Sequence, residues 1–497
     1  MRIRTVNAKG ILSLLLACLL LVPSLAACGE SAENADPAEN PAGSSEVSTP
    51  EEALEAEPEE TTAVSDELGD PDFGGRIYTV LYRDEAEHLR EITAEELTGD
   101  VINDAVFNRT VNLQNRFNME LGLLPVSEGN LNNTFSNAVS AGDRSFDVGF
   151  QHMILTASLA AAGVTLNWYS MPHLNFEKPW WTSSVKELTV NGIMYVTASD
   201  YCMNTFEMTW CLIFNKQMMT DLMIEKTPYD LVEEGDWTID SYYNMVKGVS
   251  NDSDGDGKMT AKDTYGINSY GSPWLASVSN YWWACGESIS RFDDTGKPYF
   301  AMNTEKTFDV FQKMYALLVE DDIAWMDQTS GQKMIFWNGQ ALFESMMVRD
   351  VEVNRDKDLS YGLVPYPKYD ALQEKYLTLV DGHASVMALP VTLSEDDRDF
   401  VGTMIEAFSA SAFNDVIPAY YEVAIQTKFA QDETMPKMLD LVREGRVFNF
   451  GYVYDPTINR DILVNLITSK STDLASKLKS VQKVTEKYYE KVTKDFE

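Results

Sequence analysis

An acid-rich loop carries the spacing of a calcium ligand set. Residues 252–263 read DSDGDGKMTAKD, with acids at loop positions 1, 3, 5 and 12 and a glycine at position 6. Alternate residues of such a loop turn their oxygens inward, and the glycine permits the sharp bend. The predicted ligands are Asp252, Asp254, Asp256, Lys258 through its backbone carbonyl, and Asp263. One structural Ca²⁺ is therefore the predicted cofactor, and the alternative is an acidic surface turn without an ion.

Motifs of the common catalytic centres are absent from the sequence. We find no HExxH, no GxSxG, no GxxxxGK[ST] and no GxGxxG after a strand. The four histidines, His88, His152, His173 and His383, lack the spacing of a metal pair and are expected at the surface or against a ligand. A carboxylate pair for glycoside hydrolysis leaves no trace in a sequence, so a glycan-active enzyme stays open as an alternative.

Aromatic side chains are the second chemical signal. A sugar site needs flat apolar faces for the C–H side of the rings and a few amides or acids for the hydroxyls. Most aromatic residues of an α/β protein belong to its core. The candidates for stacking on a sugar are Trp210, Trp274, Trp282 and Trp283.

The first 27 residues have the pattern of a bacterial lipoprotein signal peptide. A basic start is followed by an apolar run at residues 11–22 and by small residues before Cys28. The run is shorter than the roughly 20 residues that span a bilayer. We expect lipidation of Cys28 and a place on the extracellular face of the cytoplasmic membrane; an ordinary cleaved signal or an uncleaved anchor is the alternative.

An acidic tether is predicted at residues 28–75. Residues 29–72 contain fifteen Asp or Glu and no Lys or Arg, so the segment should repel itself and remain disordered. The net charge of the chain is −38. Nucleic acid and anionic membrane surfaces are therefore poor partners, and we expect membrane contact through the lipid alone.

Strands and helices alternate after the tether. Strands are predicted at residues 76–82, 119–126 and 145–151, with helices at 99–117 and 133–142 between them. Such βαβ units build a parallel sheet covered by helices, whose ligands sit beyond the carboxyl ends of the strands. Further helices are expected near residues 239–249, 304–319, 397–408 and 474–492, further strands near 361–366 and 385–390, and Asp100 as an N-cap.

Several short motifs occur together in a characteristic order. They are GDVINDAVFNR, SFDVGFQ, NFEKPWW, TWCLIFNKQM, VEEGDWTID, NGQALFES and YGLVPYPKYD. With the signal peptide and the tether, they resemble the extracellular solute-binding proteins (family 1-like) of bacterial ABC importers, in the branch for carbohydrates. The resemblance covers most of residues 76–497.

The resemblance implies a periplasmic-binding-protein-like α/β fold of two lobes that close over a ligand. The expected lobes are 76–205 plus 385–415 and 210–380 plus 420–497, with hinge crossings near 205–211 and 380–385. In such proteins the loop after the third strand faces the ligand, here Gln151 and His152. Arg349 and Asp381 are the other implied contacts, although Arg349 could be a surface or capping residue and Asp381 could bond the hinge backbone.

The function expected from this resemblance is capture of a sugar or oligosaccharide and its delivery to an ABC permease. The protein should be a lipid-anchored monomer that does no chemistry on its ligand. The alternatives are a cell-surface glycan-active enzyme and a sensor for a solute other than a sugar.

Overall fold

A computed structural model gives the fold of the chain. It describes residues 63–270, 277–327, 335–354, 356–425, 434–455 and 460–496. Cys28 and Trp274 lie outside the described residues. Across the described ranges, no helix combines the length and the apolar character needed to cross a membrane.

The first sheet has four strands in the order β12-β3-β1-β2. Its strands are β1 (Arg76–Arg83), β2 (Met119–Val126), β3 (Val148–His152) and β12 (Ser385–Ala388). β1 pairs in parallel with both β2 and β3, and β12 runs antiparallel to β3. The helices between the strands are α2 (Val101–Phe117) and α3 (Glu128–Ala141). The predicted βαβ units and parallel pairs are thus confirmed.

The second sheet has five strands in the order β10-β4-β9-β5-β8. Its strands are β4 (Trp210–Asn215), β5 (Tyr265–Tyr270), β8 (Ala324–Asp327), β9 (Ala341–Met347) and β10 (Tyr361–Val364). β5 is parallel to β8 and β9, whereas β4 is antiparallel to β9 and β10. The carboxyl ends of β5, β8 and β9 therefore share one edge with the amino end of β4.

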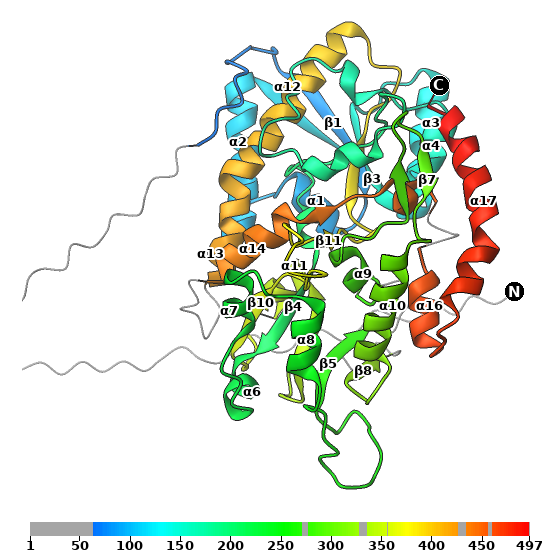
Figure 1. The fold of residues 1–497 in the computed structure, drawn as a ribbon. Helices are drawn as coiled ribbons and strands as arrows, with labels where there is room; N and C mark the ends of the chain where they lie inside the picture. The colour runs from blue at the N-terminus through cyan, green and yellow to red at the C-terminus, as the bar shows by residue number, and fades with distance from the viewer. Residues whose placement is uncertain are drawn as a thin grey trace, which may run out of the picture. The chain divides into compact units, whose positions relative to one another are not determined.

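Helices surround both sheets (Figure 1). The longer ones are α8 (Ile239–Val246), α10 (Glu305–Leu318), α12 (Glu395–Ser411), α13 (Ile417–Ile425), α14 (Met435–Glu444) and α17 (Leu474–Lys494). The shorter ones are α1 (Ala86–Ile92), α4 (Ala157–Ala161), α5 (Asn204–Glu207), α6 (Lys216–Asp221), α7 (Pro228–Glu233), α9 (Asn280–Ala284), α11 (Val348–Val353), α15 (Phe450–Tyr454) and α16 (Ile462–Thr468). Two short ribbons pair β6 (Ser290–Phe292) with β7 (Pro298–Phe300) and β11 (Thr378–Leu379) with β13 (Arg446–Val447).

Capping side chains fix the helix starts that the sequence predicted. Asp100 accepts a hydrogen bond from the backbone N–H of Asn103 and so caps α2. Thr304 does the same for α10, and Ser394 forms a capping box with Asp397 at α12. Such caps satisfy N–H groups that have no partner inside the helix. The predicted helices of the later chain are confirmed within a few residues.

The chain passes between the sheets at two adjacent segments. It leaves the first sheet after β3, builds the second sheet from β4 to β10 and returns at β12. The two passing segments pair with each other, because Thr209 bridges Val380 and Asp381 N donates to the Met208 carbonyl at 3.0 Å. Both lie where the hinge crossings are predicted. The residue limits of the two lobes stay a prediction.

The end of the predicted tether is ordered, which corrects the prediction for residues 63–75. Arg116 on α2 donates to Asp66 at 2.5 Å, to Asp70 at 2.8 Å and to the Gly69 carbonyl at 2.6 Å. Lys178 binds Glu67 at 2.7 Å. The acids of this stretch meet basic partners on the folded part of the chain, which composition alone does not reveal.

Candidate functional site

Three strand ends of the first sheet meet at one edge. β1 ends at Arg83 and β3 ends at His152, while β12 begins at Ser385, which pairs with His152 in the register. Ligands of α/β proteins bind beyond such carboxyl ends. We call the side chains gathered there the strand-end cluster: Arg83, His88, Glu91, His152, His383 and Ser385.

Arg83 ties β1 to the returning segment. Its Nη2 donates to the His383 carbonyl at 2.6 Å and to the Ser385 hydroxyl at 3.2 Å, and the residue is 2 % exposed. Burial lowers the pKa of the Arg83 guanidinium, and the negative charge of Glu91 partly offsets this decrease. A charge held this deeply needs such partners. Arg83 thus fixes the hinge segment against the first sheet.

Glu91 is the acid at the centre of the cluster. It has no exposed surface, accepts the Ser385 hydroxyl at 2.5 Å and accepts the backbone N–H of Asn204 at 3.3 Å. Its Oε1 lies 3.4 Å from Nδ1 of His88. One carboxylate therefore joins α1, the amino end of β12 and α5 near the first hinge crossing.

Gln151 and His152, predicted in the loop after the third strand, are instead the last two residues of β3, and both are buried. His152 packs against His383, with ring centroids 4.9 Å apart, and its Nε2 lies 3.4 Å from Oε1 of Glu128. Burial and the nearby Arg83 lower the pKa of His152 to about 3, so the ring is neutral at physiological pH. The amide of Gln151 is also buried, and neither of its polar atoms has a hydrogen-bond partner within the described part of the chain.

Asp381 cross-links the hinge. Its Oδ2 accepts from the indole N–H of Trp210 at 3.2 Å, and its Oδ1 accepts from the backbone N–H and the ring Nδ1 of His383, each at 3.0 Å. The hydrogen bond between the Asp381 carboxylate and the His383 ring raises the pKa of His383, whose side chain is half exposed. Asp381 was expected either to contact the ligand or to bond the hinge backbone. The structure supplies partners for the second role.

Ion pairs connect α1, which follows the first strand, with α11, which follows β9 of the second sheet. Arg349 Nη1 lies 2.7 Å from Oε2 of Glu87, and Arg90 Nη2 lies 2.9 Å from both carboxylate oxygens of Glu352. Arg90 is also 3.8 Å from Glu207 on α5. Arg349, one of the predicted ligand contacts, thus pairs with Glu87, which lies beside the first sheet, whereas Arg349 follows a strand of the second.

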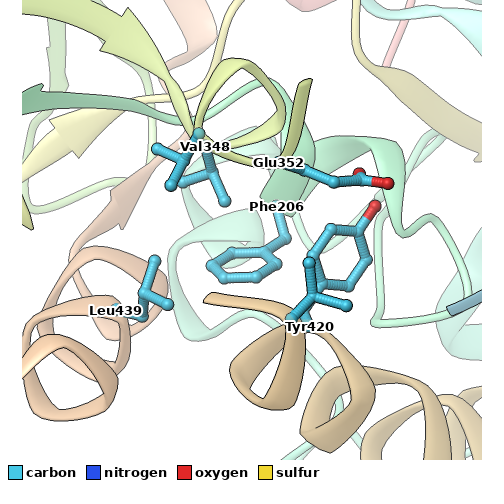
Figure 2. A pocket seen from close by; sticks show the side chains of 7 residues that line it. Phe206, Val348, Glu352, Tyr420 and Leu439 are labelled. Atoms are coloured by element: carbon cyan, nitrogen blue, oxygen red, sulfur yellow. The ribbon is translucent and has the colours of Figure 1, made fainter. Parts of the chain in front are cut away.

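Behind these ion pairs lies a small apolar pocket (Figure 2). It is lined by Phe206, Val348, Val351, Glu352, Tyr420, Val423 and Leu439. Figure 2 shows the oxygens of Glu352 and Tyr420 at one rim, where Arg90 reaches both, at 2.9 and 3.4 Å. A pocket with so few polar groups does not supply the hydrogen bonds that sugar hydroxyls need.

Comparison with known proteins identifies the architecture. No family model matches the sequence, and no curated protein matches it. Solved structures do match. The cyclic α-maltosyl-1,6-maltose binding protein of Arthrobacter globiformis has a TM-score of 0.59 at 11 % identity, over 84 % of this chain and 100 % of the other. The chain has the fold of a solute-binding protein.

Two further structures agree with that fold. An ABC substrate-binding protein of Listeria monocytogenes in complex with cycloalternan has a TM-score of 0.51 at 11 % identity, over 85 % of this chain and 99 % of the other. A cyclo/maltodextrin-binding protein complexed with maltotetraose has a TM-score of 0.52 at 14 % identity, over 86 % and 98 %. The two-lobed α/β architecture predicted from the sequence is confirmed.

The predicted stacking tryptophans lie inside this fold. Trp210, Trp282 and Trp283 are each at most 2 % exposed. Trp282 and Trp283 pack edge to face at 5.0 Å, and Trp283 contacts Tyr452 at 6.0 Å. Tyr452 in turn accepts the backbone N–H of Gly382 at 3.0 Å, so these rings support the hinge segment.

The predicted calcium loop lies at the amino end of β5, away from the strand ends described above. It is the green loop at the bottom of Figure 1, closed by a bridge between Asn251 and Thr264. Carboxylate oxygens of Asp252, Asp254 and Asp256 lie within 4.8 Å of one another. These three residues fit the first half of an oxygen ligand set.

The twelfth position of the loop is differently engaged. Asp263 is fully buried, and its two oxygens accept the backbone N–H groups of Ser253 at 2.9 Å and Thr260 at 2.7 Å. These bonds, that of Thr260 first, lower the pKa of Asp263. Both oxygens of Asp263 are therefore used to close the loop, and Asp263 is not free to coordinate a calcium ion bound by Asp252, Asp254 and Asp256.

Sequence reasoning missed Arg83 and Glu91 and expected His88 at the surface or against a ligand. His88 is in fact 1 % exposed. These residues have partners far away in the chain: His383 for Arg83, 300 positions away, and Ser385 for His88 and Glu91, 297 and 294 positions away. The available signal was their place at the end of a predicted strand, in RIYTVLYRDEAEHLRE.

Proposed function

We propose that this protein is the lipid-anchored, extracellular substrate-binding component of an ABC importer and captures a sugar or an oligosaccharide. The observation that carries the proposal is the solute-binding-protein fold, seen in proteins whose structures hold cycloalternan and maltotetraose. The paired hinge segments Thr209 and Val380 support it, because two lobes joined in this way can close over a ligand.

Closure follows from contacts that the ligand makes with both lobes. A solute that binds better to the closed form shifts the population toward it by the difference in affinity. Beyond the carboxyl end of β3, His383 presents a half-exposed ring held by Asp381. We infer that it contributes a hydrogen bond to the solute and that Gln151, His152, Arg349 and the predicted tryptophans shape its surroundings. The solute leaves unaltered, for transfer to the permease.

A ligand screen tests this function. The purified protein is heated with mono- and oligosaccharides, polyols and peptides, with bound solute identified by mass spectrometry before and after incubation. A ligand of the folded state raises stability by about 2.7 kcal/mol at a hundredfold excess over its Kd. We expect saturable stabilisation by a sugar recovered intact. Stabilisation by peptides alone, or recovery of a cleaved glycan, would contradict the proposal.

The anchor has its own test. We propose that Cys28 is lipidated and that the acidic residues after it let the protein reach the permease; the absence of basic residues in 29–72 supports an extended tether. Cys28→Ala should release the exported protein from the membrane fraction into the medium, with ligand binding retained. A Cys28→Ala protein that is exported and still sediments with membranes would rule out lipid anchoring.

The predicted calcium ion belongs to the same proposal as a structural group. The clustered oxygens of Asp252, Asp254 and Asp256 support it. The loop precedes β5, so an ion there would stabilise the second sheet rather than contact the solute.

A further inference from the structure

A histidine and two acids converge at the start of α1, just beyond the end of β1. Nε2 of His88 lies 3.6 Å from Oε2 of Glu85 and 3.6 Å from Oε1 of Glu87. The three ligand atoms all lie within 4.8 Å of one another. We propose that Glu85, Glu87 and His88 bind a divalent metal ion of the zinc class.

The His88 nitrogen that faces the acids has no other role. The residue is 1 % exposed, and Nε2 has no hydrogen-bond partner in the described ranges. A buried ring nitrogen without a partner is costly. The opposite nitrogen is engaged, with Nδ1 3.4 Å from both Oε1 of Glu91 and the Ser385 hydroxyl. Since a carboxylate only accepts, Nδ1 is the nitrogen that can donate to Glu91, and a metal ion would bind the lone pair of Nε2 in the tautomer that carries its proton on Nδ1.

This arrangement is the one that orients metal-binding histidines. A ligating imidazole donates its other N–H to a carboxylate or a carbonyl, which fixes the ring and raises the basicity of the ligand nitrogen. Glu91 supplies that carboxylate, and the Ser385 hydroxyl holds it at 2.5 Å. The groups that would orient the His88 ring, Glu91 and Ser385, are therefore already in place.

The spacing fits a small ion with short bonds. Ligand atoms around a tetrahedral zinc with bonds of about 2.1 Å are about 3.4 Å apart. The two His88–carboxylate separations of 3.6 Å lie close to that edge length. A mixed set of one imidazole and two carboxylates suits zinc better than calcium, which prefers oxygens in larger number. Three protein ligands leave a fourth position open.

The site also reaches across the hinge. Glu87 offers Oε1 to the ion while its Oε2 accepts from Arg349 of α11 at 2.7 Å. A bound ion would hold Glu87 in the position that receives Arg349. Metal binding would therefore favour the arrangement in which α1 and α11 are joined. This site stands without the proposed function, since it needs no solute.

The experiment uses the full chain without an affinity tag, titrated with Zn²⁺ in equilibrium dialysis with metal analysis, and with Co²⁺, whose visible spectrum reports coordination by nitrogen and oxygen. We compare the wild type with a Glu85→Gln/Glu87→Gln double variant, which changes only partly exposed side chains. His88→Gln is the second variant. The matched control is Asp252→Asn/Asp254→Asn in the 252–263 loop, the other acid cluster of the described chain.

We expect one Zn²⁺ per chain in the wild type and the control, weakened at least tenfold in the double variant, with loss of the Co²⁺ bands. Glu91→Gln should weaken binding by about 10- to 100-fold through the ring orientation. The proposal is overturned if the wild type binds no Zn²⁺ at micromolar concentration, if the double variant binds as tightly as the wild type, or if only the loop control loses the ion.

Discussion

Two regions of this molecule place carboxylates in opposite settings. The strand-end cluster holds Glu91 without exposed surface, bonded to groups from α5 and β12. The 252–263 loop holds Asp254 and Asp256 at the surface, bonded mainly to backbone groups two residues away. The one acid of the cluster, Glu91, connects distant segments, whereas the acids of the loop shape one turn.

The difference appears in the pKa values as well. Glu207 borders the cluster through Asn204, and burial raises its pKa to about 7 although Arg90 opposes the rise. Asp263 closes the loop, and the backbone N–H of Thr260 lowers its pKa. Lost hydration dominates in one region and local hydrogen bonds dominate in the other.

The largest effect is expected from Glu91→Ala. The change leaves the Asn204 N–H and the Ser385 hydroxyl without their acceptor and opens a cavity among buried groups. We expect a loss of about 3 kcal/mol in the free energy of unfolding. Urea unfolding followed by tryptophan fluorescence measures it, with Asp256→Ala as the exposed control. A loss below about 1 kcal/mol would mean that Glu91 does not join the segments.

The second prediction concerns pH. Folded Glu207 keeps its proton up to about pH 7, whereas in the unfolded chain it ionises near its ordinary value of 4.5. The folded state therefore binds the extra proton between these values, and stability falls as the pH rises from 4.5 to 7. The fall is at most about 3 kcal/mol. The charged groups that face it are Arg90, Glu91 and Glu352.

Glu207→Gln should remove this part of the pH dependence. Unfolding by urea at a series of pH values between 4.5 and 7.5 should show a flatter profile for the variant than for the wild type. Asp263→Asn is the control with the opposite sign, because a lowered pKa gives stability that is lost only as the pH falls below 3.8. Parallel profiles for wild type and Glu207→Gln would contradict the burial argument.

The same comparison explains what the sequence could predict. The spacing of 252–263 is local, and the structure gathers Asp252, Asp254 and Asp256 as expected. Strands and helices with a clear period, such as β2 and α17, are likewise found where predicted. Each of these features depends on residues within about twenty positions of one another in the chain.

The strand-end cluster and the hinge contact between Trp210 and Asp381 could not be predicted in this way. Arg83 meets His383, and Trp210 meets Asp381, only after two sheets have formed and the chain has returned between them. Residue type also fails to tell which face of an element a ring occupies, so Trp282 is buried although it was expected to stack on a sugar. Acidic composition predicted disorder up to residue 75, but Arg116 supplies the partner that orders Asp66.

A third, smaller effect is expected at the ion pair between α1 and α11. Arg90 and Glu352 are partly exposed, so their coupling is screened by solvent. A double-mutant cycle with Arg90→Met and Glu352→Gln should give a coupling energy of about 1 kcal/mol, reduced in high salt. The exposed pair Lys226 and Glu234 is the control, with a coupling near zero. A coupling no greater than that of the control would mean that the two helices are held by packing alone.

The smallest effect is expected in the loop. Asp254 accepts from the Asp256 N–H at 3.3 Å and lies 3.4 Å from Lys262, both weak contacts at the surface. Without divalent ions, Asp254→Ala should change the free energy of unfolding by less than about 0.5 kcal/mol. With millimolar Ca²⁺ the wild type should melt at a higher temperature and the variant should not, because the ion binds only the folded loop. If calcium raises both melting temperatures equally, the ion binds elsewhere, and the acids of the loop serve only to form the turn.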